Sequence, residues 1–119
     1  MAKTILFVCT GNTCRSYMAQ AIARNYMSRL KDKKSGIRIL SAGTGALRGE
    51  PPSPQALTVL AEMGIPAEEH RSVCLTPELI READLILVMT QNQKTGVLRL
   101  EPQARDKVFL RKDFAQDRD

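Results

Sequence analysis

A cysteine and an arginine with five residues between them have the clearest chemical potential in this sequence. Cys9 follows the apolar run 5–8, and Arg15 directly precedes Ser16 and a helical pattern. A loop of this length between a strand and a helix can curl so that its backbone N–H groups point inward, where the positive end of the helix also attracts an anion. The residues of this loop are Thr10, Gly11, Asn12, Thr13 and Cys14. The spacing therefore predicts that these residues and Arg15 bind phosphate.

The residue types at the two ends of the loop suit nucleophilic chemistry on a phosphoryl group. A field that attracts phosphate also stabilises a thiolate, so Cys9 is expected to attack phosphorus. The Arg15 guanidinium can hold two phosphoryl oxygens in a bidentate fork as charge develops. Ser16 can donate its hydroxyl to the Cys9 sulfur. We therefore expect Cys9, Arg15 and Ser16 to be catalytic, with phosphate or another oxyanion bound in the loop.

Strand-like and helix-like segments alternate along the chain around this loop. Strands are predicted at 3–9, 37–41, 85–89 and 107–110, and helices at 16–30, at 54–63, from 77 and from 91 to before Glu101. Thr76 with Pro77, and Thr90 with Gln93, are typical helix starts. The alternation predicts an α/β fold, a three-layer α/β/α arrangement with a four-stranded parallel sheet and the phosphate loop after the first strand. Ligands of such sheets bind at the carboxyl ends of the strands, where Cys9 stands.

Further segments match a known family, and over nearly all of its length the chain resembles the low-molecular-weight protein tyrosine phosphatases. The matching segments, besides the loop, are Ser41-Ala42-Gly43, His70-Arg71-Ser72, Leu75-Thr76-Pro77-Glu78-Leu79 and the run 83–90. The resemblance implies that Cys9 is the nucleophile, Arg15 the phosphate clamp and Ser16 the partner of the thiolate. It also implies a buried hydrogen-bond network of Asn12, Ser41 and His70 that supports the loop. Tyr17 stands where the family usually has proline, and we expect it to do little damage and to narrow or line the mouth of the site.

The family's general acid is an Asp-Pro pair after the last strand, followed by a helix, and this sequence contains no Asp-Pro pair. The general acid is therefore unassigned, and Asp117 and Asp119 are weak candidates in the tail. We expect one of three explanations: a C-terminally short sequence, a partner or second copy (a homodimer) that covers the sheet face left bare, or a marginally stable product.

Thr13 bears on the choice of substrate within the resemblance. Tyrosine-directed members commonly carry a larger aliphatic residue there, whereas threonine resembles the bacterial protein-arginine phosphatases. The sequence thus favours a phosphorylated protein as the substrate, with phosphotyrosine or phosphoarginine hydrolysed through a cysteinyl phosphate. Phosphoarginine is slightly favoured.

Two other functions fit part of the pattern. Arsenate reductases share the loop but need two further redox cysteines, and here Thr90 follows the third strand while Cys74 stands alone. A phosphate-binding or interaction module, impaired in turnover by the lack of the acid, would keep every loop residue. Cys14 is either a packed loop residue or a partner for Cys9 in a regulatory disulfide.

Length, composition and charge indicate the number of domains and the kinds of site to expect. A length of 119 residues with 43% apolar content predicts a single domain, 1–119. We expect a cytoplasmic protein without a membrane segment, metal or cofactor, because long apolar runs and paired C-x-x-C motifs are lacking and there is one histidine. Residues 1–60 carry nine Lys/Arg against two Asp/Glu (net +7), and residues 61–119 carry nine against eleven (net −2). This asymmetry is expected to steer phosphorylated substrates, whereas Lys31, Lys33 and Lys34 indicate a solvated helix end rather than nucleic-acid binding.

Overall fold

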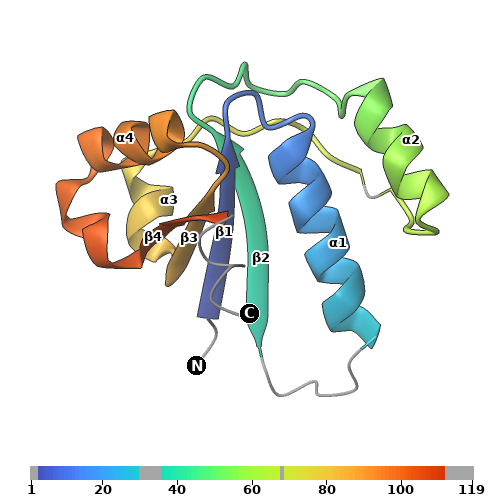
Figure 1. The fold of residues 1–119 in the computed structure, drawn as a ribbon, viewed down its shortest axis with the longest axis horizontal. Coiled ribbons are helices and arrows are strands. Elements are labelled where there is room, and N and C mark those ends of the chain that lie inside the picture. The colour runs from blue at the N-terminus through green and yellow to red at the C-terminus, as the bar shows by residue number, and fades with distance from the viewer. Residues whose placement is uncertain (1–2, 30–35, 68, 112–119) are drawn as a thin grey trace.

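The computed structural model describes residues 3–29, 36–67 and 69–111, which form a parallel four-stranded sheet with helices on both faces (Figure 1). The strands are β1 (Lys3–Cys9), β2 (Ile37–Gly43), β3 (Leu85–Val88) and β4 (Val108–Leu110), in the order β2-β1-β3-β4. The predicted α/β fold and parallel sheet are confirmed. β2 runs two residues beyond its predicted end because Ala42 and Gly43 still pair with Val8 and Cys9.

The helices follow their sequence signals closely. They are α1 (Arg15–Arg29), α2 (Pro54–Glu62), α3 (Pro77–Glu82) and α4 (Gln91–Leu100), with a 3₁₀ helix, η1, at Pro102–Lys107. The hydroxyl of Ser53 accepts from the Ala56 N–H at the start of α2, and that of Thr76 accepts from the Leu79 N–H at the start of α3. Each bond satisfies one of the free amide groups in a first helical turn. Lys31, Lys33 and Lys34, expected at the end of α1, lie outside the described residues.

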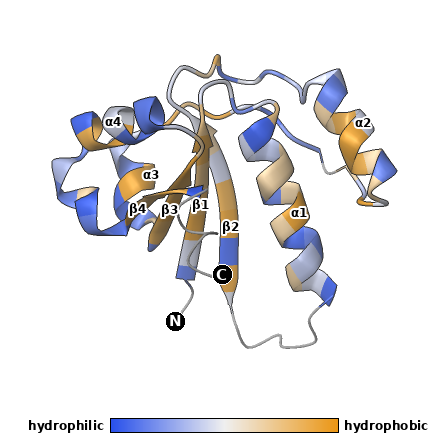
Figure 2. Cartoon of the chain, in the orientation of Figure 1, coloured by the Kyte–Doolittle hydropathy of each residue, from blue (hydrophilic) through white to orange (hydrophobic). Residues whose placement is uncertain are grey.

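The sheet separates two apolar layers. α1 and α2 lie on one side of it, and α3 and α4 lie on the other (Figure 1). Alternate residues along the strands face opposite layers: Leu6 and Val8 pack into the core with Ile80 of α3 and Val97 of α4, whereas Phe7 packs on the side of α1. Figure 2 shows the resulting band of apolar residues along the central strands. No helix in the described ranges is both long and apolar enough to cross a membrane.

The apolar face of the sheet on the side of α1 continues across β4. Phe7, Leu87 and Phe109 stand side by side in neighbouring strands, so their side chains share one face of the sheet. Phe7 and Leu87 are buried beside α1, but Phe109 is 40% exposed. This edge of the sheet therefore presents apolar surface.

Candidate active site

The loop from β1 to α1 folds back on its own cysteine. Cys9 is buried at the end of β1, and its Sγ lies 2.8 Å from the Ser16 Oγ in the first turn of α1. The backbone N–H of Asn12 also donates to this sulfur, at 3.2 Å. The Ser16 hydroxyl, the Asn12 N–H and a helix N-terminus thus surround the sulfur, an arrangement that suits a nucleophilic cysteine. The predicted neighbours Cys9 and Ser16 are thus brought together.

Asn12 lies at the centre of the loop and is fully buried. Its Nδ2 donates to the Ser16 Oγ at 2.8 Å, and its Oδ1 accepts from the Val73 N–H at 2.8 Å. Its φ is +58°, in the left-handed region that residues other than glycine seldom occupy. Asn12 therefore links the loop, α1 and the segment before α3, and holds a backbone conformation that curls the loop.

His70 also holds Asn12, through the backbone carbonyl of Asn12. Its Nε2 lies 2.8 Å from the Asn12 carbonyl oxygen, which must accept the bond, so Nε2 carries the hydrogen. The His70 ring stacks on Tyr17, with ring centroids 4.4 Å apart and planes at 29°. Tyr17 is fully buried among Ala56, Leu60 and other residues of the α1–α2 core. The expectation that Tyr17 lines or narrows the mouth is therefore wrong, because its ring points into the core beneath the loop.

Ser41 has a different partner from the one expected. Its hydroxyl donates to the Oε1 of Gln20 at 2.6 Å, and both residues are buried. This bond ties β2 to α1 instead of joining Ser41 directly to Asn12 and His70. Gln20 is not predictable as this partner, since nothing in the spacing of residues 20 and 41 indicates a contact.

The segment after β2 holds the first part of the loop. The N–H of Thr44 donates to the Cys9 carbonyl and the N–H of Gly45 donates to the Thr10 carbonyl, each at 2.9 Å. A Cβ on Gly43 would lie 2.4 Å from that same Thr10 oxygen, so only glycine allows this approach. Gly43, in the segment Ser41-Ala42-Gly43, thus allows the chain after β2 to approach the phosphate loop closely at the carboxyl ends of the strands.

The second part of the loop, Thr13 and Cys14, lies against the start of α2. The Thr13 carbonyl accepts from the Ser53 N–H at 2.8 Å, which joins the loop to the N-terminus of α2. Cys14 lines a cavity of about 520 Å³ between α1 and α2, together with Met18, Pro54, Gln55, Thr58 and Val59. All three cysteines are free thiols. Pairing of Cys9 with Cys14 stays a prediction.

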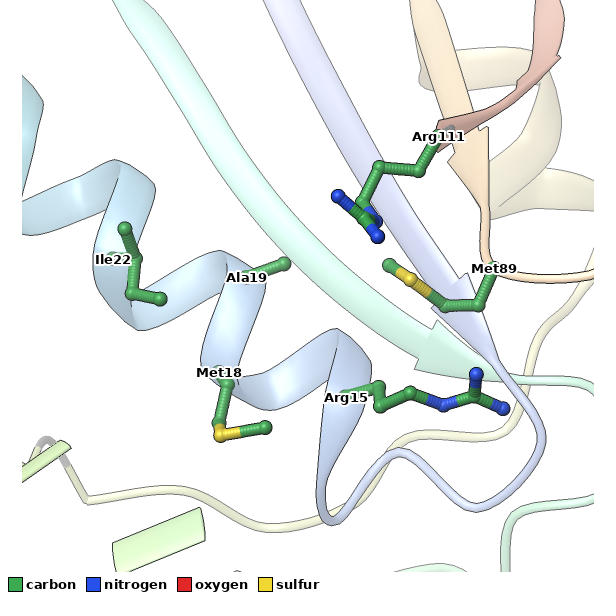
Figure 3. A pocket seen from close by; sticks show the side chains of 6 residues that line it. All are labelled: Arg15, Met18, Ala19, Ile22, Met89 and Arg111. Atoms are coloured by element: carbon green, nitrogen blue, oxygen red, sulfur yellow. The ribbon is translucent and has the colours of Figure 1, made fainter. Parts of the chain in front are cut away.

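Two arginines reach one cavity beside the loop (Figure 3). The cavity, of about 260 Å³, is lined by Arg15, Met18, Ala19, Ile22, Met89 and Arg111. Arg15 extends from the start of α1 and Arg111 from the end of β4, with Met89 between them. Arg111 is not predictable from the sequence, because its position follows only from the pairing of β4 with β3. Asp117 and Asp119 lie outside the described residues, and among those described no cluster of side chains could hold a metal ion.

Comparison with known proteins decides the family. The family model described as low molecular weight phosphotyrosine protein phosphatase matches residues 4–119. The chain belongs to this family. It is 46% identical over 109 residues, 92% of its length and 70% of the relative's, to a probable low molecular weight protein-tyrosine-phosphatase, EpsP, of Ralstonia solanacearum. It is 42% identical over 119 residues, all of its length and 76% of the relative's, to a protein-arginine-phosphatase of Geobacillus stearothermophilus.

A solved structure of this phosphatase family bears on the chemistry. The YwlE arginine phosphatase mutant with phosphorylated active site serine has a TM-score of 0.84 and 39% identity, covering 93% of this chain and 70% of that one. In that protein the active-site position carries the phosphoryl group. By family, this chain is thus a hydrolase and a cysteine-dependent protein phosphatase.

Proposed function

We propose that this phosphatase hydrolyses phosphotyrosine or phosphoarginine on proteins through a cysteinyl-phosphate intermediate, with Cys9 as the nucleophile. The observation that carries the proposal is the pair of contacts to Cys9 Sγ, 2.8 Å to the Ser16 hydroxyl and 3.2 Å to the Asn12 N–H, at the start of α1. A cysteine with a purely structural role has no need of two polar partners and a helix N-terminus.

The proposed reaction has two steps. Cys9 Sγ attacks phosphorus, a sulfur–phosphorus bond forms, and the bond from phosphorus to the leaving oxygen or nitrogen breaks as that atom takes a proton. In the second step a water oxygen attacks phosphorus and loses a proton, an oxygen–phosphorus bond forms, and the sulfur–phosphorus bond breaks to give phosphate and the Cys9 thiolate. Arg15 holds two phosphoryl oxygens throughout, and Ser16 stabilises the thiolate when it leaves in the second step. Backbone N–H groups of the loop bind the remaining charge.

Thr13 is the basis for favouring phosphoarginine. Relatives named for either substrate share this fold, at 46% identity for a probable tyrosine phosphatase and 42% for an arginine phosphatase, so overall similarity does not separate them. A hydroxyl at position 13 can form a hydrogen bond near a phosphoguanidinium, whereas a bulky aliphatic side chain would pack on an aromatic ring. We therefore propose phosphoarginine as the preferred substrate.

Substitution of Cys9 tests the mechanism. Cys9→Ser should abolish hydrolysis of an aryl phosphate while vanadate still binds, and Arg15→Lys should lower kcat/KM by about 100-fold because a point charge cannot replace the fork. Cys74→Ser is the matched control, since Cys74 is an exposed free thiol. Retained turnover in Cys9→Ser would refute the assignment.

Asp117 and Asp119 can be tested as general acids by replacing each with asparagine. Loss of the acid should slow a substrate with a poor leaving group by about 10²–10⁴-fold. A nitrophenyl phosphate, whose leaving group needs no proton, should be slowed much less in the first step. A variant with equal losses for both substrates would exclude that aspartate as the acid.

A further inference from the structure

Gln93 lies in the first turn of α4, far from the phosphate loop in sequence, yet its side chain contacts the loop. It is a polar residue buried to 3% exposure. Its Oε1 accepts from the backbone N–H groups of Met89 (2.8 Å) and Thr90 (2.9 Å). Its Nε2 lies 3.1 Å from the Thr10 Oγ1, across 83 residues of sequence. One side chain therefore joins the end of β3, the start of α4 and the residue next to Cys9.

These contacts fix the direction of the hydrogen bond to Thr10. Two backbone N–H groups can only donate, so the atom between them must be the amide oxygen of Gln93. The other atom is then the NH₂ group, which can only donate, and the Thr10 Oγ1 must accept. The Thr10 hydroxyl consequently keeps its own hydrogen for another partner. The structure gives that hydrogen no acceptor among residues 3–29, 36–67 and 69–111.

Thr10 is also restrained at its backbone. Its carbonyl accepts from the Gly45 N–H at 2.9 Å, and this oxygen would meet any Cβ placed on Gly43. Thr10 is exposed, whereas its neighbour Cys9 is buried. The Thr10 hydroxyl belongs to a residue held at both its side chain and its backbone, so it is a fixed donor beside the nucleophile.

We propose that Gln93 is a positioning residue, which presents the Thr10 hydroxyl as a hydrogen-bond donor to a phosphoryl oxygen of the anion in the loop. The inference rests on the proposed function, because it assumes that the loop binds a phosphoryl group. A phosphoryl oxygen can only accept, so it matches a hydroxyl whose hydrogen is free. A donor fixed before substrate arrives needs no reorganisation during the reaction.

Gln93→Glu reverses the hydrogen bond with little change in shape. One carboxylate oxygen can still accept from the Met89 and Thr90 N–H groups, so the start of α4 keeps its cap. The second oxygen accepts as well, and it takes the hydrogen of the Thr10 hydroxyl. The donor is then lost to the substrate, and kcat/KM for an aryl phosphate should fall by about tenfold or more, the usual effect of one hydrogen bond to a charged group.

Thr10→Val separates this effect from simple repulsion by the new carboxylate. Valine has the shape of threonine without the hydroxyl, so Thr10→Val should also lower kcat/KM by about tenfold. Thr10→Ser keeps the hydroxyl and should retain most of the parent kcat/KM. In the Thr10→Val background, Gln93→Glu should cause little further loss. An equal fold-loss from Gln93→Glu in both backgrounds would show repulsion and would overturn the proposal.

Binding of inorganic phosphate, measured by titration calorimetry, identifies the substrate atom involved. The dissociation constant should rise by about tenfold in Thr10→Val and in Gln93→Glu, since free phosphate carries the same acceptor oxygens. An unchanged dissociation constant in both variants would overturn the proposal. This measurement needs no turnover, so a chain that binds phosphate but hydrolyses nothing would refute the proposed function and leave this inference intact.

Discussion

Asn12 forms a separate hydrogen bond through each of its four polar groups, to Cys9, His70, Val73 and Ser16. The two backbone groups are available to any residue, but the two side-chain bonds need an oxygen and an NH₂ group a fixed distance apart. The φ of +58° adds a second requirement, because among residues with a side chain asparagine is one of the few that tolerate it. The nucleophile's geometry thus depends on a residue that does not itself react.

Replacement of Asn12 tests these two requirements separately. Asn12→Gly relieves the backbone and loses both side-chain bonds, leaving the Val73 N–H without its acceptor. Asn12→Ala loses the same bonds and keeps an unfavourable φ. We expect the free energy of unfolding to fall by about 1–3 kcal/mol for glycine, and by about 1 kcal/mol more for alanine, in urea denaturation. Equal stability of the two variants would show that the backbone conformation has no cost.

Thr13 carries the predicted substrate preference, and two substitutions distinguish its hydroxyl from its size. Thr13→Val keeps the volume and removes the hydroxyl, so it should lower kcat/KM for phosphoarginine with little gain for phosphotyrosine. Thr13→Ile adds bulk and should raise the kcat/KM ratio of phosphotyrosine to phosphoarginine by about 10–200-fold, the range of single pocket changes. A ratio that is the same in all three proteins would show that Thr13 does not select the substrate.

Local motifs made some of these residues predictable from the sequence. The motif that spans Cys9 to Ser16 is contiguous, so the chain folds it into one loop and the contacts within it follow from spacing. The partners of Ser41 and Thr10 could not be predicted, because Gln20 and Gln93 reach them only through the packing of helices on the sheet. Long-range hydrogen bonds between side chains leave no periodic trace in a sequence.

At the scale of elements, strand and helix positions were mostly predictable because the local signals agree with the global fold. Thr76 and Pro77 mark the start of α3, and Ser53 and Pro54 mark the start of α2. The end of β2 was predicted two residues early, since pairing with β1 extends the strand through Ala42 and Gly43. That extension is what brings the segment after β2 against the phosphate loop.

The contact between the end of β2 and the loop can be tested with a matched pair of glycine variants. A Cβ at Gly43 would lie 2.4 Å from the Thr10 oxygen and 2.9 Å from the Ala46 Cβ, so Gly43→Ala must displace backbone. A Cβ at Gly45 would meet only the Thr10 Cγ2 at 3.5 Å and the Thr10 oxygen at 3.9 Å, which are ordinary contacts. We expect Gly43→Ala to cost about 1–3 kcal/mol in the free energy of unfolding, as overpacking does, and to lower kcat.

Gly45→Ala is the control, with kcat and stability near those of the parent chain. Thermal denaturation and aryl-phosphate turnover of both variants measure the two effects. If Gly43→Ala matched Gly45→Ala in both measurements, the close approach of β2 to Thr10 would have no part in shaping the site.

At the scale of the whole molecule, positive charge is concentrated in the half of the sequence that contains the loop. The net charge is +7 for residues 1–60 and −2 for residues 61–119. The fold adds Arg111, from the other half, to the cavity that Arg15 lines. A phosphorylated substrate therefore approaches two guanidinium groups and a helix N-terminus near the carboxyl ends of the strands.

This arrangement predicts that kcat/KM falls as salt rises, mainly through KM. Added salt shortens the screening length from about 10 Å at 0.1 M to about 3 Å at 1 M, which removes long-range attraction but leaves close contacts in the loop. Arg111→Gln should raise KM at low salt and flatten its dependence on salt, because one cation on the cavity is lost. Arg38→Gln is the matched control, since Arg38 is an exposed arginine near the start of β2, at the edge of the sheet away from the loop. Both variants lower the net charge by one, so only position distinguishes them. Identical salt dependences of KM in the two variants would mean that overall charge, and not the cavity beside Arg15, attracts the substrate.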